Sequence, residues 1–389
     1  MDHTMMATNV GSIVVTAADL LALTTCIGVL GFRIWVVAFK DRTSYPSPDF
    51  LMPLWWTLGI CLAVLTLSSI GELLRRALEM SGRPIGELAP MLPAVLSKTH
   101  FGRVWLLRLI ALAVLWLGWR QRRGLDSPGV SAAMLAAACL IAASRSLSGH
   151  AADWGDITIP ELVDWMHLLA VSLWGGSLIA LTVTGFHTLT ERADERRQVV
   201  AAMVSRWSAL AGAALAVVIL TGIYNAWLEV QSFEALLTTA YGRLLLVKLS
   251  LVLIIVTLGA ANRYLSLPSL HAWATGAASI DKPSSLLATI LSFLTLEWSR
   301  QRTHRPLKRF VRRAMLEGIF IIGAIICVAV LVGQMPARHV NRMPAGHPMH
   351  TSGVAPRVLI CRSSHADGVA DPYLRAAALC RTRLRRAGT

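Results

Sequence analysis

The chain has 389 residues, of which 55% are hydrophobic and only 15% are charged. Its mean hydropathy is +0.57, and soluble domains carry about 25% charged residues, so an ordinary soluble protein is excluded. The net charge of +15 does not indicate nucleic-acid binding, because the basic residues lie in loops and in the tail, where they set membrane orientation. We therefore expect an all-α, polytopic helical bundle in the lipid bilayer, with no nucleic-acid partner.

Eight apolar stretches are long enough to cross a bilayer, which takes about 20 residues per helix. We place the spans at residues 12–39, 52–74, 104–120, 130–147, 161–186, 205–228, 243–263 and 315–335. Lys and Arg are most abundant in the loops after the odd-numbered spans, so the positive-inside tendency places both termini in the periplasm of a Gram-negative cell. The apolar segment Ser285–Trp298 is too short for a span, and we interpret it as interfacial or re-entrant.

A short repeat indicates that the eight spans form two halves. THFGRVWLLRL (Thr99–Leu109) and TAYGRLLLVKL (Thr239–Leu249) each open the third helix of a four-helix unit, and a weaker match aligns Asp19 with Asp164. A four-helix duplication keeps its orientation, so two parallel repeats are predicted. The expected segments are an N-terminal Met/His segment (1–11), a first half (12–150), a second half (151–336) and a polar, basic, disordered tail (337–389).

The stretch from Glu161 to Phe186, ELVDWMHLLAVSLWGGSLIALTVTGF, is the most informative of the spans. Asp164 and His167 lie one helical turn apart near its start. Ionisable side chains inside a membrane helix are costly and are functional-site candidates by default. Trp174 lies deeper, beside two glycines, and we expect it to pack against a helix that the glycines allow to approach closely.

Other polar side chains of the spans collect at the same level. Arg103, Arg243, Asp19, Glu72 and Asn225 are expected to be structural polar residues near the outer side, and Glu317 one near the cytoplasmic side. Together with the histidines of that level, the outer set predicts an outward-facing polar site that narrows inward.

The histidines of this level favour a transition metal, because neutral imidazole is the commonest ligand for such ions and thioether sulfur suits Cu(I). The predicted metal ligands are His150 and His167, with His100, Met166 and Asp164 as further candidates. Met166 adjoins His167, although adjacent helical positions do not share a face. For His100 alone, a hydrogen-bonded residue at a helix end is the favoured interpretation.

Two short Met/His clusters flank the spans and resemble metal-gathering arms. Ordinary tail composition explains such short clusters equally well. Their members are His3, Met5 and Met6 near the N-terminus and His339, Met343, His347, Met349 and His350 after the last span.

Several segments of the second half carry a family resemblance. They include DWMHLLAVSLWGGSL (Asp164–Leu178), TAYGRLLLVKLSLV (Thr239–Val252) and RRAMLEG (Arg312–Gly318), and their order and spacing agree over residues 95–340. This stretch resembles CopD, the inner-membrane copper resistance protein D. The resemblance implies an eight-helix protein that moves copper across the inner membrane beside a periplasmic CopC-type copper-binding protein.

The leading prediction is a copper transport protein, not an enzyme, that takes periplasmic Cu(I) or Cu(II) inward through a His/carboxylate site. The alternative is a b-type haem oxidoreductase, since histidines in helical bundles can ligate haem. A transmembrane electron path would need histidine pairs in both leaflets, and the inner half offers only His187. A third interpretation is a non-transporting copper-binding scaffold for a periplasmic copper protein. An ATP-driven pump is disfavoured, because the sequence has no ATP-binding motif and no DKTG-type loop.

Overall fold

Eight helices of the computed structural model are long and apolar enough to cross a membrane. The structure describes residues 3–37, 48–82, 86, 88–90, 92–121, 124–148, 158–184, 197–276, 289–291 and 306–334. No strand occurs among these residues. The predicted all-α polytopic bundle is therefore confirmed. The candidate spans are Val10–Val36, Met52–Ser81, His100–Arg120, Pro128–Ser146, Ile159–Thr184, Arg197–Val230, Ala240–Thr275 and Arg309–Val332.

The helices follow one another in two groups of four spans. The first group comprises α1 (His3–Gly31) with the π-helical extension η1 (Phe32–Val36), α2 (Met52–Ser81), the short α3 (Leu92–Lys98), α4 (His100–Arg120) and α5 (Pro128–Ser146). The second group comprises α6 (Ile159–Val171), the π-helical η7 (Ser172–Gly176), α7 (Ser177–Thr184), α8 (Arg197–Val230), the short α9 (Phe233–Thr238), α10 (Ala240–Ala261), the π-helical η9 (Asn262–Ser266), α11 (Leu267–Thr275) and α13 (Pro306–Val332). Residues 1–343 form one compact unit, and the second unit, residues 344–389, lies outside the described residues.

Several helices run beyond the spans that hydropathy alone predicted: α8 begins at Arg197 and α13 at Pro306, and the second and seventh spans end later. Helix α2 continues to Ser81, because Arg75 forms ion pairs with Glu72, at 2.5 Å, and with Glu79. Such pairs three and four residues apart stabilise helical turns outside an apolar core. The seventh span continues through η9 into α11. Of the predicted interfacial segment Ser285–Trp298, only residues 289–291 are described, so its placement stays a prediction.

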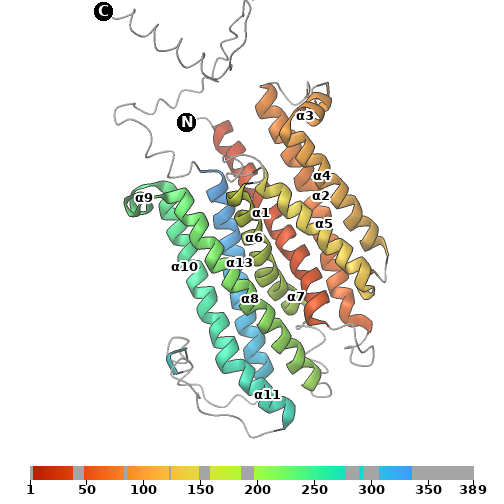
Figure 1. Cartoon of the computed structure of the whole chain (residues 1–389), viewed down its shortest axis with the longest axis vertical. Helices are drawn as coiled ribbons and strands as arrows, with labels where there is room; N and C mark the ends of the chain where they lie inside the picture. The colour runs from red at the N-terminus through yellow and green to blue at the C-terminus, as the bar shows by residue number, and fades with distance from the viewer. Residues whose placement is uncertain are drawn as a thin grey trace, which may run out of the picture. The chain divides into compact units, whose positions relative to one another are not determined.

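Helix α1 lies at the centre of the bundle, with α2, α4 and α5 on one side and the helices of the second group on the other (Figure 1). It packs against α2 and α5 of its own group and against η7, α7 and α13 of the other group. Its inner residues, Leu23, Cys26, Ile27, Val29 and Leu30, are fully buried. The first helix of the chain therefore joins the two groups of spans.

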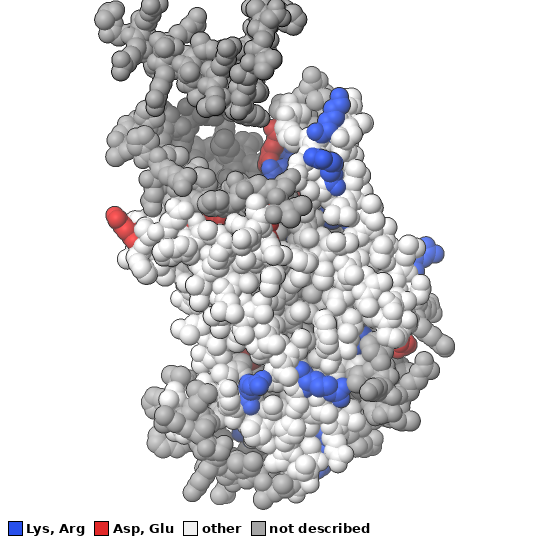
Figure 2. All heavy atoms as spheres, in the orientation of Figure 1, with Lys and Arg blue, Asp and Glu red and all other residues white. Residues whose placement is uncertain are grey.

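The outer surface of the bundle fits an apolar solvent. On the face shown in Figure 2, the charged side chains lie near the helix ends, and a broad uncharged band crosses the middle of the helices. Large apolar side chains such as Ile60, Leu117 and Leu220 are more than half exposed. In a membrane protein these side chains face lipid, so their exposure requires no partner protein.

The two repeat segments have the same local structure. Thr99 caps α4 by accepting a hydrogen bond from the Gly102 amide at 2.9 Å, and Thr239 caps α10 in the same way through Gly242 at 3.0 Å. Each threonine also donates, at 2.6 Å, to a carbonyl of the short helix before it, α3 or α9. Glycine is required after each cap, since a Cβ at Gly102 or Gly242 would lie within 2.5 Å of a carbonyl oxygen of that short helix.

Candidate functional site

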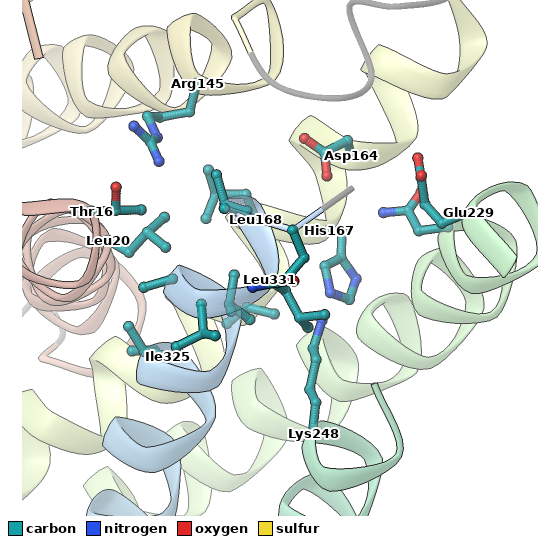
Figure 3. Close-up of a pocket in the computed structure, with 18 of the residues that line it drawn as sticks. Thr16, Leu20, Arg145, Asp164, His167, Leu168, Glu229, Lys248, Ile325 and Leu331 are labelled. Atoms are coloured by element: carbon teal, nitrogen blue, oxygen red, sulfur yellow. The ribbon is translucent and has the colours of Figure 1, made fainter. Parts of the chain in front are cut away.

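A cavity of about 1350 Å³ lies at the end of the bundle where α1 begins and α8 ends. It is lined by helices of both groups, and Figure 3 shows the side chains that point into it. Of the predicted site residues, the described ones that line it are Asp19, Glu72, His100, Asp164, His167 and Asn225. Six further charged side chains, which the sequence analysis did not select, line it as well: Arg75, Arg76, Arg108, Arg145, Glu229 and Lys248.

The His167 imidazole is fixed by a hydrogen bond to α8. The Thr221 hydroxyl lies 2.6 Å from the Val217 carbonyl, to which it donates, and 2.8 Å from Nδ1 of His167. Because its proton is engaged with Val217, the hydroxyl accepts from Nδ1–H. The neutral ring then has its lone pair on Nε2, which is the form of histidine that binds metals. Gly222 leaves room for the ring, since a Cβ there would lie 3.3 Å from the His167 Cε1 atom.

Asp164 lies one turn before His167 on α6, and residues at this spacing share a helix face. Its carboxylate accepts a hydrogen bond of 2.7 Å from Ser146 at the end of α5. The helix begins just before it, where the Glu161 side chain accepts from the Thr158 amide at 3.2 Å and completes a capping box. Asp164 and His167 thus enter the cavity from one helix, with partners on two others.

A buried ion-pair network occupies the equivalent place in the first group of helices. Asp19 of α1 is 3% exposed and accepts hydrogen bonds from Ser68, at 2.6 Å, and from Arg108 of α4. Arg108 also donates to Ser69 at 2.7 Å, and Arg145 of α5 lies 3.6 Å from the second oxygen of Asp19. With two arginines beside it, the Asp19 carboxylate serves as a structural anion that joins four helices.

Two protein-family models match the chain, one in each group of helices. A model described as "Copper resistance protein D" matches residues 201–331, and one described as "Copper resistance protein D-like, N-terminal domain" matches residues 5–157. Together these two matches cover most of the chain. The chain belongs to the copper resistance protein D family. The match extends the resemblance found in the sequence to the first four spans.

Two curated relatives of this family member are similar over part of their length. "Copper transport protein CutJ" of Bacillus subtilis (strain 168) is 29% identical over 172 residues, which are 43% of this chain and 31% of that protein. "Inner membrane protein YebZ" of Escherichia coli (strain K12) is 29% identical over 177 residues, which are 45% of this chain and 58% of that protein. The chain therefore covers less than two thirds of either relative. No solved structure matches it. Family membership supports a copper resistance role in a multi-pass membrane protein.

The remaining predicted ligands and structural polar residues of this CopD-family chain that the structure describes lie at the edge of the cavity or away from it. His100 lies at the rim of the cavity, where its Nε2 atom is 3.3 Å from the Leu147 carbonyl. Met166 is 42% exposed and does not line the cavity. Arg103 and Arg243 are also exposed and do not line it. Among the described residues, no group of three or more His, Cys, Asp or Glu side chains is placed to hold a metal ion.

Several predicted metal-contacting side chains lie outside the described part of this CopD-family chain. His150 lies outside the described residues, as does the cluster His339, Met343, His347, Met349 and His350. The backbone of His3, Met5 and Met6 belongs to α1, but their side chains are outside the description.

Trp174 is buried, and its neighbours Gly175 and Gly176 contact α13 and α1, which confirms the expected close helix packing.

A second polar cluster joins α10 to α13 at the opposite end of the bundle. Glu317 is fully buried and accepts a hydrogen bond of 2.6 Å from the Asn262 amide in η9. Arg313, one turn earlier on α13, donates to Ser266 at 2.7 Å and to the Ala261 carbonyl at 3.2 Å. The cluster fixes the π-helical segment against α13.

Replacing Glu317 tests this structural role. We expect Glu317→Leu to destabilise the protein by about 1–3 kcal/mol, because the buried Asn262 amide loses its acceptor. Glu317→Gln keeps an acceptor and should cost less. Thermal unfolding of the purified protein in detergent measures both, with the lipid-facing Ile319→Leu as control. Equal stability of Glu317→Leu and wild type would show that the cluster does not hold η9.

Proposed function

We propose that this chain moves copper across the inner membrane, and that His167 with Asp164 binds the ion in the cavity between the two groups of helices. The observation that carries the proposal is the hydrogen bond from His167 to Thr221, which commits Nδ1 and leaves the Nε2 lone pair available to a metal. An imidazole and a carboxylate one helical turn apart are a suitable pair of ligands for Cu(II), and imidazole also suits Cu(I).

The structural support for transport, rather than storage, is the place of the cavity. It lies at the junction of the two groups of helices, where transporters built from repeats place their substrate sites. With both termini in the periplasm, as the loop charges predict, the cavity is on the periplasmic side and copper enters from there. A periplasmic copper-binding protein of the CopC type would be a suitable donor. The haem alternative has no support from the family descriptions.

Cellular copper, measured by elemental analysis at matched membrane levels of protein, tests the proposal. We expect wild type to raise cell-associated copper above an empty vector, and His167→Gln to abolish at least 90% of that rise, an order-of-magnitude effect. His271→Gln is the matched control, because His271 lies on α11 and does not line the cavity. It should behave as wild type.

Three results would contradict parts of the proposal. A Soret band in the purified protein, with unchanged cellular copper, would favour the haem oxidoreductase. Lower copper in cells with wild type would reverse the direction. Copper binding by the purified protein without any change in cells would favour the scaffold.

A further inference from the structure

The Lys248 side chain shares the cavity with the proposed copper ligands. It lies near the middle of the α10 span, lines the cavity, and extends from α10 toward the His167 imidazole (Figure 3). Its ammonium group is within electrostatic range of both Asp164 and His167. Two positive charges repel one another strongly in a medium of low dielectric constant. A cation that binds Asp164 and His167 therefore has to contend with Lys248.

The sequence repeat gives Lys248 a counterpart in the first group of helices. Lys248 occupies the same place in TAYGRLLLVKL as Arg108 does in THFGRVWLLRL, and Asp164 aligns with Asp19. In the first group, Arg108 is bound to Asp19 and Ser69. Each group of helices thus brings a basic residue from its third span near an aspartate of its first span.

The two basic residues differ in how firmly they are held. Arg108 is 7% exposed and is fixed by its two hydrogen-bonded partners. For the Lys248 ammonium the described part of the chain provides no hydrogen bond and no ion pair within 4.0 Å, and Asp164 accepts a hydrogen bond from Ser146. Lysine carries a compact charge on a flexible stem, whereas the planar guanidinium of arginine holds a fixed geometry. Lys248 can therefore approach the carboxylate or withdraw from it.

We propose that Lys248 is an internal competitor of copper: its ammonium group neutralises Asp164 when copper is absent, and copper binding at His167 and Asp164 displaces it. This inference rests on the function proposed above. It gives the second half a site that always holds one cation, either the lysine or the metal. The return of Lys248 then favours release of the ion.

The test is the copper affinity of the full-length protein in detergent, measured by competition with a chromophoric Cu(I) chelator under reducing conditions. We expect Lys248→Leu, which removes the charge without adding a sulfur ligand, to bind Cu(I) about tenfold more tightly than wild type, because the competing charge is gone. Lys248→Gln is a second neutral variant with a polar side chain and should act in the same direction, while Lys248→Arg should not raise the affinity. The control Arg120→Leu removes one charge at an exposed position of α4 that does not line the cavity, and should match wild type.

The outcomes separate this inference from the proposed function. Unchanged or weaker binding by both neutral variants, while wild type binds copper, would overturn the competition and leave the copper site in place. If neither wild type nor any variant binds copper, the proposed site fails and the role of Lys248 fails with it. Size-exclusion profiles of each variant verify that the compared proteins are folded.

Discussion

Gly176→Ala is expected to prevent the first and second groups of helices from packing together. A Cβ at this position would lie 1.9 Å from the Thr24 carbonyl oxygen and 2.9 Å from the Gly28 Cα atom of α1. Both neighbours are backbone atoms of the central helix, so no side-chain rotation can relieve the contact. Because α1 and η7 meet along this line, the whole helix would have to move. Overpacking of a well-packed interior commonly costs about 1–3 kcal/mol, and a backbone contact this short should cost more.

The measurement is the fraction of membrane-extracted protein that elutes as a single species on size-exclusion chromatography, with its thermal unfolding midpoint. We expect most Gly176→Ala protein to be aggregated or absent from the membrane. Gly318→Ala is the matched control, because a Cβ at that helical glycine of α13 meets no atom within 4 Å. Alanine favours helix by up to about 1 kcal/mol over glycine, so the control should be at least as stable as wild type. A monodisperse Gly176→Ala protein with a wild-type midpoint would contradict the close crossing of α1 and η7.

Arg108→Met is expected to destabilise the bundle by about 3–5 kcal/mol, the usual cost of leaving one partner of a buried ion pair uncompensated. The substitution leaves the Asp19 carboxylate buried, with Ser68 and the more distant Arg145 as its remaining partners. It also removes the guanidinium that donates a hydrogen bond to the Ser69 hydroxyl. Arg145 offsets part of the loss, so the effect should lie at the lower end of this range.

A double substitution distinguishes the ion pair from mere packing. Replacing both charges, in Asp19→Asn with Arg108→Met, should recover part of the stability, since a buried pair can often be replaced by neutral groups at little cost. Thermal unfolding in detergent measures the series, with Arg103→Met on the exposed side of the same helix as control. A double variant that is no more stable than Arg108→Met would show that Asp19 does not depend on the arginine.

The spans were predictable because hydropathy is a property of a continuous stretch, and all eight appear in the structure. His167 and Asp164 could be found because ionisable groups stand out in an apolar span. Arg108 and Lys248 were visible in the repeat as an arginine–lysine match, but the sequence does not reveal which way a mid-span residue faces. That direction depends on how the helices are rotated against each other, which only packing determines. The π-helical segments were not predictable for the same reason, since they follow from tertiary contacts.

The position of Asp19 also affects how the protein is made. Asp19 and Arg108 are 89 residues apart in the chain. At about 5–20 residues per second, the ribosome needs on the order of ten seconds to synthesise that interval. During this time the first helix leaves the ribosome with an aspartate whose arginine partner has not yet been made, and a charged side chain inside an isolated membrane helix is costly on insertion. We therefore expect α1 to remain beside the insertion machinery until α4 arrives.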